Sequence, residues 1–85
     1  MLRQDFRELM LAFLRDANPG VAIARVADDD DLLELGYVDS LRIMEMVALL
    51  EDTLGTNVPL ESIDPRAFRT VGGVYEAVIL DEGAS

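Results

Sequence analysis

The chain has 85 residues, a formal net charge of −10 from 17 acidic and 7 basic side chains, and neither Cys nor His. This length allows one domain, and the acidic balance disfavours binding to nucleic acids or to anionic membranes. Without Cys or His the chain lacks disulfides, thiolate metal ligands, the commonest general base and the best nucleophile, so autonomous catalysis is disfavoured.

The sequence predicts a single domain over residues 1–85, with an ordered core at about residues 2–80 and a polar tail at residues 81–85. Its first residues hold no apolar signal core, and no apolar run approaches the roughly 20 residues of a membrane span. We therefore expect a cytoplasmic monomer that does not enter a membrane.

The first predicted helix lies within residues 2–18 and stops near Asn18, and its apolar side chains recur at helical spacing. They are Leu2, Phe6, Leu9, Met10, Phe13, Leu14 and Ala17. The sequence Asn18-Pro19-Gly20 then predicts the end of the helix, since Pro cannot extend the hydrogen-bond ladder and Gly readily takes positive φ.

Residues 18–38 form a connection that is long for so small a domain, and we expect it to hold local structure or function. A short helical turn, capped by an Asp and ended by Gly36, is predicted near its end. Six apolar side chains of this segment are predicted to pin it to the helices. They are Val21, Ile23, Val26, Leu32, Leu33 and Leu35.

The run Asp28 to Asp31 raises the possibility of a calcium site. An EF-hand loop needs spaced ligands, with Gly at its sixth position and a distal Glu. Counting from Asp28, the sixth residue is Leu33. The run therefore favours a solvated acidic turn, and we predict no metal site.

The second predicted helix runs from about Ser40 to Leu54, with Asp39 as its N-cap and Gly55 just past its end. One apolar stripe is expected to face the core and consists of Ile43, Met46, Val47, Leu50 and Leu54. A second stripe consists of Leu41, Met44 and Ala48. Periodicity alone leaves open whether the second stripe is also core or is a surface for a partner protein.

The remaining segments predict two further helices. Asp64 and Pro65 are typical of an N-cap and first helical residue, so a one-turn helix should carry Phe68 inward. Thr70 is placed to cap a last helix that begins at Val71, although its glycine pair weakens the first turn. The sequence thus predicts an all-α fold: a small antiparallel bundle of three to four helices with a long first loop.

The segment from "LGYVDSL" through "MEMVALLEDTLG" and "NVP" to "FRTVGGVYEAV" resembles the acyl carrier protein family, including aminoacyl and peptidyl carriers. Asp39, Ser40 and Leu41 align with the family's attachment motif. The resemblance covers roughly residues 5–80. It implies an acyl-carrier-like bundle in which Ser40 bears a covalent 4′-phosphopantetheine arm from coenzyme A.

This resemblance implies a carrier that is not an enzyme and that holds an acyl or aminoacyl group as a thioester on the arm. A magnesium-dependent phosphopantetheinyl transferase would attach the arm, and a loading ligase and a downstream synthase or transferase would be the other partners. The positions implied to meet them are Asp39, Leu41, Arg42, Met44, Glu45, Ala48 and Asp52.

Two departures from fatty-acid carriers favour a specialised biosynthetic pathway. Tyr37 and Val38 separate Gly36 from Asp39, where many of those carriers have one residue, and Arg42 replaces a common acidic residue. The alternative function is an unmodified protein–protein interaction module of the same fold. An enzyme is disfavoured, because only carboxylates and two tyrosines could serve as a base.

Overall fold

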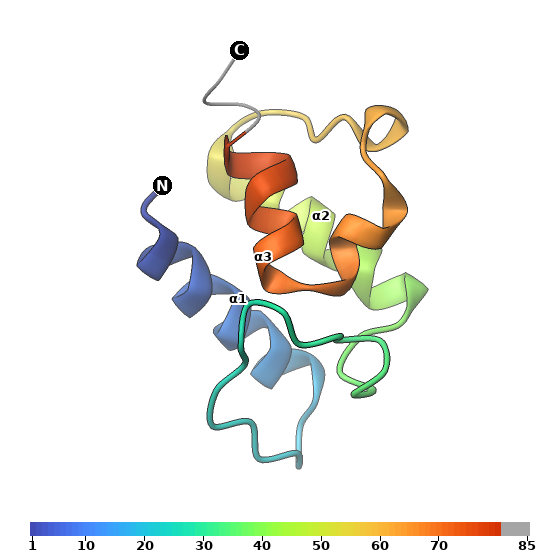
Figure 1. Cartoon of the computed structure of the whole chain (residues 1–85). Coiled ribbons are helices and arrows are strands. Elements are labelled where there is room, and N and C mark those ends of the chain that lie inside the picture. Colours follow the sequence, from blue (N-terminus) through green and yellow to red (C-terminus); the bar gives the residue numbers. More distant parts are fainter. Residues whose placement is uncertain (81–85) are drawn as a thin grey trace.

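Helices are the regular elements of residues 1–80, the part of the chain that the computed structural model describes (Figure 1). The elements are α1 (Arg3–Ala17), α2 (Ser40–Leu54), the 3-10 helices η1 (Leu60–Ser62) and η2 (Pro65–Arg69), α3 (Val71–Val74) and the π-helical η3 (Tyr75–Leu80). Residues 1–80 include no strand, so the predicted all-α bundle is confirmed. The predicted polar tail lies outside the described residues.

Helix α1 ends where the sequence predicts, and it runs in the opposite direction to α2 and α3 (Figure 1). The Asn18 side chain donates hydrogen bonds of 2.9 Å to the carbonyl oxygens of Leu14 and Tyr37. It therefore ties the end of α1 to the segment before α2. Leu2 lies before the helix and is exposed, so its predicted place in the buried stripe is wrong.

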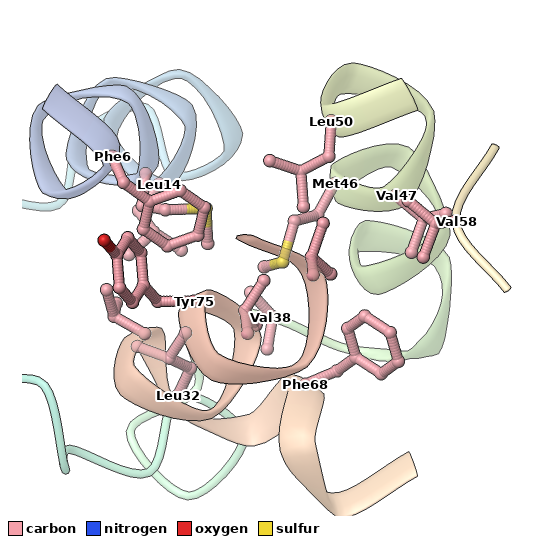
Figure 2. Close-up of a cluster of buried hydrophobic side chains, with 14 of the residues drawn as sticks. Phe6, Leu14, Leu32, Val38, Met46, Val47, Leu50, Val58, Phe68 and Tyr75 are labelled. Carbon is pink, nitrogen blue, oxygen red and sulfur yellow. The ribbon is translucent and has the colours of Figure 1, made fainter. Parts of the chain in front are cut away.

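The core lies where α1, α2 and the C-terminal helices meet, and Figure 2 shows its centre. The rings of Phe6 and Tyr75 pack edge to face with centroids 5.4 Å apart. Met46 and Leu50 point from α2 into the same core and are fully buried. The stripe predicted to face the core is thus confirmed at its centre, while Ile43 and Leu54 at its ends are only half-buried.

Two aspartates of the acidic run hold the long first loop against the helices. Asp28 accepts hydrogen bonds from the guanidinium groups of Arg3 and Arg7, and Asp31 pairs with Arg69 of η2. The expectation of a merely solvated acidic turn is therefore wrong for these two residues. Within residues 1–80 no cluster of three potential ligand side chains is placed to hold a metal ion.

These ion pairs lower the pKa of both carboxyl groups. Hydrogen bonds from Arg7 and then Arg3 lower the pKa of Asp28 from 3.8 to about 2. A hydrogen bond from Arg69, helped by the N–H of Glu34, lowers the pKa of Asp31. Each carboxylate is more favourable in the folded chain than in the unfolded chain, so it stabilises the loop contacts at neutral pH.

The end of the loop is a single hydrogen-bonded turn over residues 31–36, not a helix. As predicted, an Asp caps it: Asp31 Oδ1 accepts the N–H groups of Leu33 and Glu34. Gly36 ends it at a φ of 79°, the left-handed region that favours glycine. Leu32 is buried, but Val21, Leu33 and Leu35 are exposed, so the predicted role of these three in pinning the loop is wrong.

The C-terminal helices follow their predicted caps. Asp64 accepts the N–H of Arg66 at the start of η2, whose Phe68 is buried, and Thr70 Oγ1 accepts the N–H of Gly73. Close contact explains the glycine pair. A Cβ on Gly72 would lie 3.0 Å from the Asp28 carbonyl oxygen, and one on Gly73 would lie 2.5 Å from that of Ala67.

The buried position of Leu50 predicts a large loss of stability on truncation. Leu50→Ala should lower the free energy of unfolding by about 2–5 kcal/mol, because it removes buried methyl groups and leaves a cavity. Leu41→Ala is the matched control: that leucine is exposed, and the change should stay within about 0.5 kcal/mol. Urea unfolding followed by helical circular dichroism measures both, and equal losses would contradict the assigned core face.

The Asp28 ion pairs predict a pH-dependent contribution to stability. At pH 7 and low salt, Asp28→Asn should lower the free energy of unfolding by about 1 kcal/mol. Because the folded pKa lies below the unfolded value, the carboxylate's contribution is complete above pH 3.8 and is lost as the pH falls toward 2. The difference between variant and wild type should therefore shrink with acidification.

Asp29→Asn is the control, since Asp29 is exposed and has no ion pair to residues 1–80. Urea midpoints recorded from pH 7 to pH 2.5 compare the three proteins. A gap between Asp28→Asn and wild type that stays constant across this range would contradict the assigned tether.

Candidate functional site

Ser40 is the first residue of α2 and is exposed. Asp39 caps the helix: its Oδ1 accepts the Arg42 N–H at 2.9 Å, and its carbonyl oxygen accepts the Ile43 N–H at 2.9 Å. These bonds fix the residue at which the helix begins. The cap therefore fixes the position of Ser40 at the start of α2.

The segment before Ser40 is anchored on its inner side. The N–H groups of Tyr37 and Val38 both donate to the carbonyl oxygen of Leu32, and Asn18 donates to the carbonyl of Tyr37. Leu32 and Val38 are buried in the core (Figure 2). The chain thus reaches Ser40 from a fixed support, while Ser40 itself remains at the surface.

The start of α2 is favourable for a negative charge. Within residues 1–80, no acceptor is bonded to the N–H groups of Ser40 and Leu41. Such free N–H groups carry the positive end of the helix dipole and favour an anion beside them. The Ser40 hydroxyl also makes no hydrogen bond within the described part of the chain, so a phosphodiester there would break none.

The second apolar stripe of α2 lies at the surface. Leu41 and Met44 are 64% and 54% exposed, and Ala48 is exposed as well. The question that periodicity left open is thereby answered: this stripe is not core. Exposed apolar side chains that gather on one helix face are typical of a surface that another protein covers.

The charged residues of α2 differ in whether another residue of the chain binds their side chain. Arg42 pairs with Glu45 through contacts of 2.8 and 3.1 Å, so the two charges largely neutralise each other. Glu51 accepts the Val58 N–H and so supports the segment after the helix. Asp52 is exposed and has no ion pair to residues 1–80, which leaves its charge available to a partner.

Two hollows of the surface lie elsewhere. One, of about 270 Å³, is formed by α1, the first loop and Val71, and the other, of about 530 Å³, is formed by η1, η2 and the C-terminal helices. No residue of α2 lines either hollow. Ser40 is exposed and lines neither of these two hollows.

Sequence reasoning missed two features of this region. The exposure of Leu33 and Leu35 gave no signal, because leucines in a loop are more simply explained as anchors to the core. The Arg42–Glu45 pair could have been found, since residues three apart are neighbours on a helix.

A family model described as the phosphopantetheine attachment site (PP-binding) matches residues 17–78, which is well over half of the chain. Comparisons with curated proteins and with solved structures gave no significant match. Among residues 1–80, no helix is long and apolar enough to cross a membrane. The chain belongs to the phosphopantetheine-binding family of acyl and peptidyl carrier proteins, and covalent 4′-phosphopantetheine is the cofactor of this domain.

Proposed function

We propose that Ser40 is the residue that bears the 4′-phosphopantetheine arm and that residues 1–85 act as one carrier domain. The observation that carries the proposal is an exposed serine hydroxyl at the capped start of α2, within the residues matched by the attachment-site family. The free N–H groups of the first turn would favour the phosphodiester that results.

The attachment reaction is a phosphoryl-type transfer from coenzyme A. Ser40 Oγ attacks the pyrophosphate phosphorus that bears pantetheine, and the bond from that phosphorus to the 3′,5′-ADP portion breaks. The products are the serine phosphodiester, 3′,5′-ADP and the proton released by the hydroxyl. A separate transferase with magnesium supplies the base and the charge stabilisation, because the chain has no His or Cys.

The protein then acts by delivery and not by catalysis. The terminal thiol of the arm holds an acyl or aminoacyl group as a thioester, which a loading ligase supplies and a downstream synthase or transferase consumes. The chain is a cytoplasmic monomer in a specialised biosynthetic pathway, without nucleic-acid or membrane partners. Its net charge of −10 supports this proposal through repulsion of phosphate backbones, anionic lipids and other copies of the chain.

The partner-binding surface is proposed to be the exposed face of α2. Apolar contact would come from the stripe and electrostatic steering from the charges around it. Its members are Asp39, Leu41, Arg42, Met44, Glu45, Ala48 and Asp52. Asp39 has a second role as the helix cap, so replacing it would disturb the fold as well as recognition.

Modification at Ser40 predicts a change of mass. Incubation with coenzyme A, magnesium and a broad-specificity phosphopantetheinyl transferase should raise the intact mass by one phosphopantetheinyl group. Ser40→Ala should stay at its unmodified mass, whereas Ser62→Ala, which removes another exposed serine, should be modified like wild type. An unchanged wild-type mass, with a known carrier modified in parallel, would favour the unmodified interaction module instead.

Reversing the charge at position 52 should slow the reaction of the chain with a basic partner enzyme. Asp52→Lys should lower the transferase's kcat/KM by about tenfold at low salt, since steering acts on encounter. The free energy of unfolding should change by no more than about 0.5 kcal/mol, because exposed charges add little stability. Glu45→Lys should act in the same direction, but it also breaks the pair with Arg42.

Glu8→Lys is the control for Asp52→Lys, because it makes the same charge change at an exposed position on α1. Initial rates at several salt concentrations separate a local effect from the change in net charge. Equal slowing by both variants would count against a partner surface on α2.

A further inference from the structure

The turn over residues 31–36 presents two leucines to solvent beside the proposed attachment site. Leu33 is 37% exposed and Leu35 is 50% exposed. Leu32, which directly follows the acidic run, is fully buried. Leu32 thus anchors the turn, whereas Leu33 and Leu35 each leave a large part of an apolar side chain in water.

Polar contacts and buried Leu32 hold this turn. Asp31 pairs with Arg69 and accepts the N–H groups of Leu33 and Glu34. The N–H of Leu32 donates to the carbonyl oxygen of Arg69 at 2.7 Å. Leu33 and Leu35 therefore project from a fixed backbone, and a fixed apolar projection loses little entropy when a partner covers it.

The turn leads directly into α2 (Figure 1). Along the chain, Ser40 lies between two pairs of exposed apolar side chains. Leu33 and Leu35 precede it, and Leu41 and Met44 follow it. Half of the eight exposed large apolar side chains of the described residues fall within residues 33–44. We call these four residues the serine-flanking surface.

We propose that the phosphopantetheinyl transferase docks on the whole serine-flanking surface, so that Leu33 and Leu35 are anchors for it in addition to α2. This inference rests on the proposed function, because it assumes that Ser40 is the residue modified. An enzyme that brings coenzyme A to Ser40 Oγ must cover the chain on both sides of that atom. An interface limited to α2 would leave the leucines before Ser40 in water.

Charge complementarity favours the transferase as the occupant. An enzyme that binds coenzyme A needs basic residues for its phosphates close to the reacting atoms. Glu34 and Asp39 are exposed acidic residues beside the leucines and Ser40, so they face that basic rim favourably. A second copy of this chain or an anionic membrane would instead meet the net charge of −10 with repulsion.

The test uses the transferase, coenzyme A and magnesium with the full chain. Leu33→Ser/Leu35→Ser should lower kcat/KM by about tenfold, the effect of losing roughly one strong interface contact. The loss should appear as a raised KM with kcat within about twofold of wild type, because the leucines act in binding and not in the chemical step. Leu35→Ser alone, a milder change, should give about a threefold loss.

The matched control is Val21→Ser/Leu60→Ser, whose side chains are 49% and 37% exposed but lie outside residues 33–44. This control should react like wild type. A Leu33→Ser/Leu35→Ser protein that reacts as fast as wild type would overturn the inference while leaving Ser40 modification intact. If wild type itself is never modified, the proposed function fails, and this inference fails with it.

Two further measurements test whether Leu33 and Leu35 serve in fold stability or in self-association instead. A large drop in the urea midpoint of the double variant would assign Leu33 and Leu35 to the fold and overturn the inference. Sedimentation of wild type as a dimer and of the double variant as a monomer would assign them to self-association, with the same consequence. We expect an unchanged urea midpoint and monomers throughout.

Discussion

The fastening of the long first loop is the constraint on which the rest of the structure depends. A connection of this length would leave the start of α2 loosely placed if apolar side chains alone held it. Here the carboxylates of Asp28 and Asp31 bind arginines of α1 and η2. Leu32 and Val38, at the end of the loop, are buried in the core. Ser40 can therefore stand at the surface in a fixed position.

Helix α2 has a buried face and an exposed apolar face. One face carries Met46 and Leu50 into the core and supplies stability, while Leu41 and Met44 remain in water at some cost in free energy. That cost is consistent with the proposed function, in which several enzymes bind this face in turn. In the proposed function, these exposed apolar side chains and the charge of Asp52, which is unpaired within residues 1–80, are the contacts offered to partner enzymes.

Much of this could be predicted from the sequence, because caps and periodicity are local signals. Asp39 with Gly55 marks both ends of α2, and Asp64-Pro65 marks η2, so these boundaries follow from backbone chemistry within a few residues. The ion pairs could not be predicted in this way. Arg69 and Asp31 are far apart in the chain, and only the assembled fold brings them together. The exposure of Leu33 escaped prediction for the same reason.

Location of the modified residue tests the central claim most directly. After reaction with coenzyme A and the transferase, tandem mass spectrometry of proteolytic peptides identifies which side chain carries the phosphopantetheinyl group. The account predicts that fragment ions place it on Ser40 and that Ser62 and Ser85 are unmodified. A group found on any other residue, or a Ser40 peptide that stays unmodified while the whole protein gains mass, would contradict it.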